Sequence, residues 1–308
     1  MRPLIAIPAI VLVLALSLNS RSAATAEVRR EYLGLDLAAN LELPTGRTVK
    51  DGPVAIIVHG TLGHHGLEIV RTLQATLKAR GVASLGITLS LGLNARRGMF
   101  DCGLEHDHRA SDAVDEIGAW VDWLKEQGVP RVTLIGHSRG AQQVLHYAAS
   151  EPDAVVDRLL LAAPVSETLE QAAAHYAAAF GGDLKAILEA AAKLVEAGED
   201  DTIVAAPGFL SCKSARVTAA ALLDYYDPER KRSVLALAQR ILRPVLIIAA
   251  GADTVSAGLA ARVKAADLGA NVELVTIAGA DHFFQDLFAD ELADRSAAFM
   301  IRKSPASP

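Results

Sequence analysis

One serine of this sequence stands in a setting that could make it a nucleophile. The pentapeptide GHSRG places Ser138 between Gly136 and Gly140, directly after the apolar run at residues 132–135. This pattern predicts a strand that turns sharply into a helix, and such a turn lifts the serine hydroxyl out of the sheet edge. Because a serine hydroxyl is a poor nucleophile by itself, the sequence must also supply a base that takes its proton.

A histidine and an aspartate late in the chain fit the remaining roles. His282 and Asp253 each follow a short apolar run that is typical of a strand. The imidazole would take the serine proton, and a carboxylate bonded to its other nitrogen would hold the ring in the required tautomer. Asp281 is the nearest competitor, but a residue next to the histidine is poorly placed to reach the far side of its ring. The chain order of serine, aspartate and histidine is the one expected of a serine on such a turn.

The elements that would position these residues follow a regular alternation. Apolar strand-like runs are separated by helical patterns, such as the amphipathic stretch at residues 110–127. The runs lie at residues 54–58, 82–89, 132–135, 158–161, 245–248 and 272–277. Short strands that are apolar on both faces predict an α/β fold, in which helices cover both faces of a mostly parallel sheet. Residues 36–43 are expected to add early antiparallel strands.

One stretch breaks the alternation. Residues 166–241 are rich in alanine and mostly helical in pattern, which predicts a helical cap inserted over the strand ends. The predicted core then comprises residues 27–165 and 242–300, followed by a tail at residues 301–308. Aromatic side chains such as Tyr176 recur at helical spacing in the insertion, where they could line a substrate pocket or pack one helix onto another.

The first residues have the features of a targeting segment. A basic start at Arg2 precedes an apolar run at residues 4–18, and the small-residue sequence Ala-Thr-Ala ends at Ala26. This pattern predicts a signal peptide at residues 1–26, whose cleavage leaves a mature chain that begins near Glu27 and is periplasmic or secreted. The apolar run is short for a transmembrane helix, so no stable membrane span is expected after cleavage; an uncleaved anchor is the alternative.

The chain has 2 cysteines, Cys102 and Cys212. In an oxidising compartment the pair could form a disulfide, whereas the alternative is two small buried thiols. A single pair carries no spacing signature, so the sequence leaves both possibilities open.

Composition and charge argue against several classes of function. The chain has 308 residues, 51% hydrophobic and 21% charged, as is typical of an ordered globular protein. The formal net charge is -6 and no long Lys/Arg block occurs, so a nucleic-acid partner is not expected. Phosphate-binding glycine loops and paired Cys-x-x-Cys sites are absent, so neither a cofactor nor a metal is expected.

Two pairs of polar side chains could have a role in binding. His106 and His108 could join a metal, but their spacing matches no familiar zinc helix, and a solvated loop explains them more simply. Arg96 and Arg97 are predicted to be a solvated pair, with recognition of an anionic substrate as the alternative.

The motifs taken together resemble the α/β-hydrolase superfamily, specifically its serine esterases and lipases. The resemblance rests on His59-Gly60, the GHSRG pentapeptide, Gly251-Ala-Asp253 and Asp281-His282. It covers nearly all of the predicted mature chain, and the insertion is the least matched part.

This resemblance implies further roles and a reaction. In the family the His-Gly pair opens the oxyanion loop, which implies that the backbone N–H groups of Thr61 and Arg139 bind the oxyanion, with Leu62 in place of Thr61 if the loop turns one residue later. The implied reaction is hydrolysis of a carboxylic ester of a small-molecule acyl substrate, through an acyl-enzyme on Ser138 and without a cofactor. Rivals with the same triad are a thioesterase, an amidase or peptidase, and an acyltransferase. A noncatalytic binding protein that retains the fold is the rival from another class.

Overall fold

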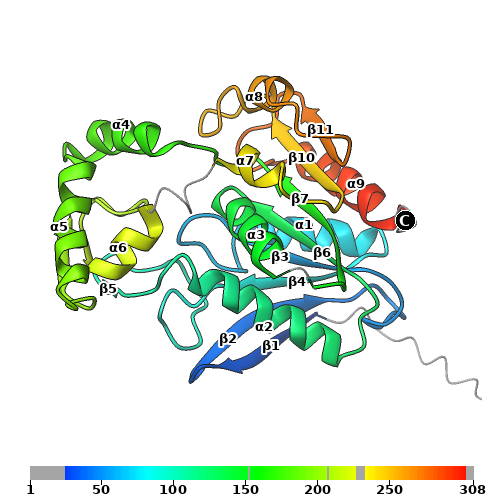
Figure 1. Ribbon diagram of the computed structural model, residues 1–308. Helices are drawn as coiled ribbons and strands as arrows, with labels where there is room; N and C mark the ends of the chain where they lie inside the picture. The colour runs from blue at the N-terminus through cyan, green and yellow to red at the C-terminus, as the bar shows by residue number, and fades with distance from the viewer. Residues whose placement is uncertain (1–24, 152, 207, 227–232, 303–308) are drawn as a thin grey trace, which may run out of the picture.

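The computed structural model describes residues 25–151, 153–206, 208–226 and 233–302 (Figure 1). The predicted signal peptide lies outside the described residues except for its last two, and so does most of the predicted tail. Within the described part, no helix is long and apolar enough to cross a membrane.

An eight-stranded sheet forms the centre of the molecule. In spatial order its strands are β1 (Thr25–Tyr32), β2 (Leu35–Glu42), β4 (Ala83–Thr88), β3 (Val54–Val58), β6 (Val132–His137), β7 (Val156–Ala162), β10 (Val245–Ala250) and β11 (Val272–Ile277). The pairs β1–β2 and β2–β4 are antiparallel, and the pairs from β4 to β11 are parallel. The predicted α/β fold, with its early antiparallel strands, is confirmed.

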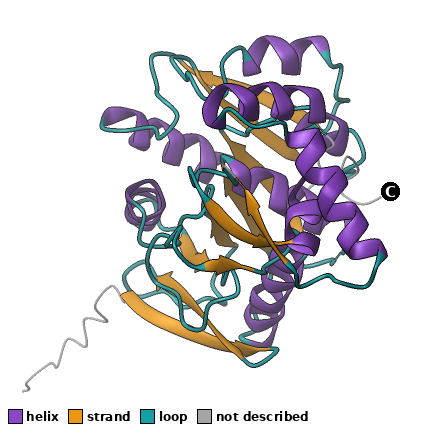
Figure 2. Cartoon of the chain, turned by 90° about the vertical axis from the view of Figure 1, so that its left-hand side faces the viewer, coloured by secondary structure: helices purple, strands orange, loops and turns teal. Residues whose placement is uncertain are grey.

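The central strands are covered on both faces. Every residue of β3, β4 and β6 is buried. Because successive side chains of a strand point to opposite faces, such burial requires helices on both sides, as Figure 2 shows. One face packs against α1 (Glu68–Ala79) and α9 (Leu287–Ile301). The other packs against α2 (Asp112–Glu126), α3 (Arg139–Ser150), α7 (Val234–Ala238) and α8 (Leu259–Ala265).

The segment predicted as a helical cap contains strands as well as helices. Its helices α4 (Leu169–Phe180), α5 (Leu184–Glu196) and α6 (Ala219–Tyr226) stand together on the left in Figure 1. Its strands β8 (Ile203–Ala206) and β9 (Ala215–Thr218) form an antiparallel hairpin. We call these five elements the cap. Within it Tyr176 is buried and donates to the Gly208 carbonyl, so it packs the cap.

A long core loop joins the cap to the main sheet. Residues 89–111, which we call the bridging loop, connect β4 to α2 and include the short strand β5 (Glu105–His106), which pairs with β9. Cys102 of this loop forms a disulfide with Cys212 of the cap. The structure therefore decides between the two alternatives that the sequence left open for the cysteines.

Candidate active site

The turn between β6 and α3 presents Ser138. The serine has φ 55° and ψ -120°, a conformation that costs energy for a residue with a Cβ. Its N–H donates to the Ala162 carbonyl at 2.9 Å, which helps to hold the turn. A Cβ on Gly140 would lie 2.4 Å from the Val58 carbonyl oxygen, and one on Gly136 would lie 2.4 Å from backbone atoms of the following helix. Both glycines are thus required by close backbone approach.

The structure brings the predicted serine, histidine and aspartate together. His282 Nε2 lies 2.9 Å from Ser138 Oγ, and His282 Nδ1 lies 2.8 Å from Asp253 Oδ2. The three residues are 6%, 6% and 8% exposed, respectively for serine, histidine and aspartate. With a carboxylate on one side, the imidazole carries its proton on Nδ1, which leaves Nε2 free to accept the serine proton.

The carboxylate beside the imidazole is held by the backbone. Asp253 Oδ1 accepts N–H bonds from Val255 at 2.7 Å and from Ser256 at 2.9 Å. Burial by itself would raise the pKa of Asp253, but the hydrogen bonds from His282 and from the backbone lower it overall. Asp281 instead accepts from the N–H groups of Phe283 and Gln285 in its own loop. The carboxylate that faces the imidazole is therefore that of Asp253.

A second buried histidine supports the first. His137 Nε2 donates to the backbone carbonyl of His282 at 2.9 Å, and the two rings lie 5.0 Å apart between centroids. Burial lowers the pKa of His137 to about 4, so the ring is neutral near neutral pH. Sequence reasoning assigned no role to this residue, although its place next to the nucleophile was a usable signal.

The loop after β3 passes beside the serine. His59 is buried and its Nδ1 donates to the Gly60 carbonyl, while its Nε2 accepts from the Leu89 N–H at 3.1 Å. A Cβ on Gly60 would lie 3.2 Å from Ser138 Cβ, so the backbone comes close to the nucleophile. We call residues 59–66 the oxyanion loop, after the role that the resemblance implies. In the part of the chain that the structure describes, the N–H groups of Thr61 and Leu62 donate to no protein acceptor.

The residue after the nucleophile reaches toward this loop and the cap. Arg139 Nε donates to Thr61 Oγ1 at 3.1 Å, and Arg139 with Tyr225 of α6 lines a small cavity. Burial raises the pKa of Tyr225 and Tyr226, and the positive charge of Arg139 opposes this rise. The site therefore lies where the core meets the cap.

Comparison with known proteins places this geometry in a family. The model of the alpha/beta hydrolase family matches residues 55–295. The chain belongs to the alpha/beta hydrolase family. No curated protein matches it.

Several solved structures share the fold of this alpha/beta hydrolase. Est1E from Butyrivibrio proteoclasticus is 21% identical with a TM-score of 0.60, over 89% of this chain and 97% of that one. The esterase domain of a Rhodothermus marinus protein is 19% identical with a TM-score of 0.56, over 90% and 97%. A hydrolase, titled putative, from Agrobacterium vitis S4 is 18% identical with a TM-score of 0.61, over 92% and 100%. At these identities the likeness shows the common fold alone.

The structure of this alpha/beta hydrolase buries His106 and His108, which the sequence predicted to lie in a solvated loop. His106 is 2% exposed and lies among the rings of Phe100, Phe209 and Tyr225, so the prediction of a solvated loop is wrong there. His108 is also buried and bonds to the Tyr225 hydroxyl through Nδ1 at 3.0 Å. Among the described residues, no group of three or more His, Cys, Asp or Glu side chains is arranged to hold a metal.

The two adjacent arginines differ in burial. Arg97 is exposed and pairs with Glu27, as a solvated arginine would. Arg96 is 6% exposed and donates to backbone carbonyls, so for this residue the predicted solvated pair is wrong. Sequence reasoning missed it because two adjacent arginines give no sign of which one the fold buries.

Proposed function

We propose that this protein is a serine hydrolase that cleaves a carboxylic ester through an acyl-enzyme on Ser138. One observation carries the proposal: a buried imidazole lies within hydrogen-bond reach of a serine hydroxyl on one side and of the Asp253 carboxylate on the other. A serine and histidine at this distance, with the histidine oriented by a third group, form the arrangement that activates a nucleophile.

The proposed reaction has two halves. Ser138 Oγ attacks the ester carbonyl carbon while His282 Nε2 takes the hydroxyl proton, and the proton then passes to the departing alcohol oxygen. Water next attacks the acyl carbon, again giving its proton to His282, and the bond to Ser138 Oγ breaks as the serine regains a proton. The Asp253 carboxylate remains ionised throughout and stabilises the imidazolium.

Backbone N–H groups are proposed to bind the developing oxyanion. One donor is the N–H of Arg139, which begins α3 directly after the nucleophile. The other is the N–H of Thr61 or Leu62 in the oxyanion loop, neither of which donates to an acceptor among the described residues. Each such donor is worth about 3 kcal/mol in the transition state.

An ester is preferred over the other acyl substrates. Two of the structural neighbours, Est1E and the Rhodothermus marinus domain, are esterases by name, which supports this choice. A thioesterase, an amidase or peptidase, and an acyltransferase would use the same three side chains and remain alternatives. A noncatalytic protein would have little need of a buried, hydrogen-bonded triad, so we place it last.

We also propose that the protein is exported to the periplasm or secreted. The apolar run at residues 4–18 supports this proposal, and so does the disulfide, since such bonds persist in oxidising compartments. The intact mass of the protein recovered outside the cytoplasm of its own host tests this proposal. We expect the mass of a chain that begins near Glu27, and the mass of a chain that retains Met1 would contradict cleavage.

Hydrolysis of a short and a long p-nitrophenyl ester tests the enzymatic proposal. The Ser138→Ala variant should lose nearly all activity, by about 10⁵-fold or more in kcat, because the nucleophile is gone. A fluorophosphonate probe should label the wild type at Ser138 and leave the variant unlabelled. Equal hydrolysis by both proteins would show that Ser138 is not the nucleophile.

A further inference from the structure

The oxyanion loop adopts a turn that needs outside support. The Gly63 N–H donates to the Gly60 carbonyl at 3.1 Å, which closes a four-residue turn with Thr61 and Leu62 at its centre. Leu62 has φ 53°, in the left-handed region that residues with a Cβ adopt at a cost. The sign of φ at this third position separates the two common turn types and decides which way the peptide between the central residues faces. Holding Leu62 in this conformation therefore aims the N–H group of Leu62, which belongs to that central peptide.

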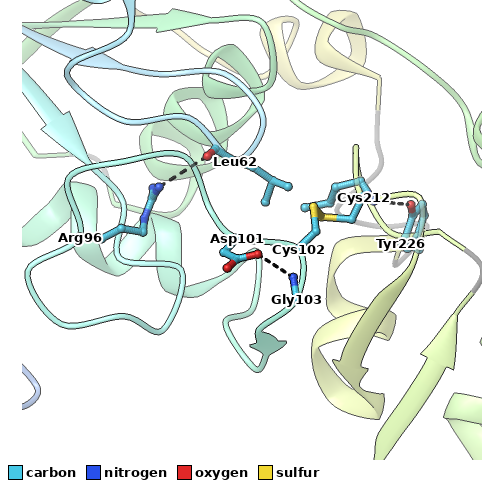
Figure 3. Close-up of a disulfide and its surroundings, with 8 residues drawn as sticks. Leu62, Arg96, Asp101, Cys102, Gly103, Cys212 and Tyr226 are labelled. Atoms are coloured by element: carbon cyan, nitrogen blue, oxygen red, sulfur yellow. Dashed lines mark hydrogen bonds between the residues drawn. A yellow bond between two sulfur atoms is a disulfide. The ribbon is translucent and has the colours of Figure 1, made fainter.

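The bridging loop supplies that support through hydrogen bonds. The Phe100 N–H donates to the Leu62 carbonyl at 3.1 Å. Arg96 Nη1 lies 3.5 Å from the same oxygen (Figure 3). Arg96 Nη2 donates to the Gly63 carbonyl at 2.6 Å. The carbonyls of the last two residues of the turn are thus fixed by one neighbouring segment.

The guanidinium of Arg96 ties the oxyanion loop to its own segment at the same time. It donates to the Leu89 carbonyl from Nε at 2.9 Å and from Nη2 at 2.6 Å, and to the Gly98 carbonyl from Nη1 at 2.5 Å. Burial lowers its pKa to about 10, so it stays charged near neutral pH. Within the described residues no carboxylate lies at ion-pair distance from it. The N–H groups of its planar guanidinium donate to backbone carbonyls in several directions at once, an arrangement that the single ammonium group of lysine cannot reproduce.

The far end of the same segment is anchored in the cap. Cys102 follows Phe100 by two residues and is bonded to Cys212, as Figure 3 shows. The Leu62 side chain is 4% exposed and packs in one hydrophobic cluster with Phe100 and with Phe209 of the cap. Backbone and side chain of Leu62 are therefore both held by residues outside the oxyanion loop.

We propose that Arg96 is a positioning residue that holds the oxyanion loop in its active turn, and that the Cys102–Cys212 disulfide anchors the segment through which it acts. The inference rests on the proposed function, since it assigns Arg96 to the oxyanion site of that reaction. Arg96 touches no reacting atom. Its contribution is to keep the loop from relaxing to the turn in which the central peptide faces the other way.

Arg96→Lys is the decisive variant, and Arg97→Lys is its matched control. The control makes the same change at the neighbouring exposed arginine, which pairs with Glu27. Rates are measured on the better of the two p-nitrophenyl esters and divided by the concentration of serine labelled by the fluorophosphonate, so that unfolded protein does not count. We expect Arg96→Lys to lower kcat about 10- to 100-fold with KM changed less than about twofold, because the loop acts on the transition state. Arg97→Lys should match the wild type.

A trifluoromethyl ketone provides a readout that a merely structural role would not move. Ser138 Oγ adds to the carbonyl carbon of the unhydrated ketone, and its proton passes to His282, which gives a tetrahedral oxyanion. Ki should therefore rise in Arg96→Lys by about the factor by which kcat/KM falls. An unchanged kcat per labelled serine, or a change confined to KM, overturns the proposal. If Ser138→Ala remains active, the proposed function fails and this inference falls with it; if that variant is inactive while Arg96→Lys keeps full kcat, this inference alone fails.

A second variant keeps the test open should Arg96→Lys not fold. The paired change Cys102→Ser with Cys212→Ser frees the anchored end of the segment and leaves Arg96 in place. We expect kcat per labelled serine to fall severalfold, Ki for the ketone to rise in parallel and KM to stay unchanged. If Arg96→Lys yields no folded protein and this double variant keeps full kcat, the proposal is overturned.

Discussion

Asp253 and Asp281 both lie near His282, yet they bond in different directions. Asp253 faces Nδ1 of the ring, whereas Asp281 caps the N–H groups of its own loop. Two backbone N–H bonds and the imidazole together outweigh burial and keep the Asp253 pKa below its usual value. The residue that sequence order selects is therefore also the one whose carboxylate is hydrogen-bonded to the imidazole.

The two aspartates allow a matched test. Asp253→Asn should lower kcat about 10⁴-fold, because an amide in place of the carboxylate lets the imidazole take the wrong tautomer. Asp281→Asn should keep kcat within about twofold, since an amide oxygen can still accept from the two loop N–H groups. Steady-state hydrolysis of the p-nitrophenyl ester measures both. A larger loss in Asp281→Asn than in Asp253→Asn would reverse the assignment.

The elements of the main sheet were predictable because burial on both faces leaves a plain mark in sequence. The run at residues 54–58 and the run at 132–135 became β3 and β6. The short strands of the cap and of the bridging loop were not predicted. In the cap, β8 and β9 have 4 residues each with mixed exposure, and β5 of the bridging loop has 2, too few for any periodicity to show. Their pairing depends on contacts that join residues far apart in the chain, and no local pattern announces such contacts.

Some residues of the candidate site could likewise be predicted from local sequence pattern, and others depend on contacts between distant parts of the chain. The serine, histidine and aspartate follow strand ends, so their positions could be read from local pattern and chain order. His137 offered only its place next to the nucleophile, and Arg96 could not be assigned from local pattern at all. The burial of Arg96 depends on carbonyls of Leu62 and Leu89, which meet only when the loops after β3 and β4 come together in the folded sheet.

The strand-to-helix turn makes a prediction about packing. Gly140→Ala would push a Cβ to within 2.4 Å of the Val58 carbonyl oxygen, so β3 and α3 must separate. We expect a loss of about 3 kcal/mol in the free energy of unfolding, together with loss of kcat as Ser138 moves. Gly118→Ala in α2 is the control, because its Cβ would meet Tyr147 at an ordinary 3.4 Å and alanine favours a helix. Urea denaturation of both variants checks this; equal stability in the two would contradict the packing argument.

At the scale of the whole molecule, several histidines are buried as neutral rings. Burial lowers the pKa of His59 to about 3, of His106 to about 3 and of His137 to about 4. They lie in the oxyanion loop, at the junction with the cap and beside the nucleophile. Because the folded pKa values lie below the value of about 6.5 in the unfolded chain, the unfolded state binds more protons in between. Stability from these rings is therefore full above pH 6.5 and is lost progressively as the pH falls toward 3 or 4.

This linkage predicts marked acid sensitivity. Each of the three histidines should remove roughly 2 kcal/mol from the free energy of unfolding between pH 7 and pH 5, since each pKa unit corresponds to about 1.4 kcal/mol. Urea denaturation at pH 7, 6 and 5 measures the slope. His106→Phe fits the aromatic surroundings and should lower that slope by about a third. A free energy of unfolding that stays constant from pH 7 to pH 5 would mean that these rings gain protons in the fold as readily as in the unfolded chain.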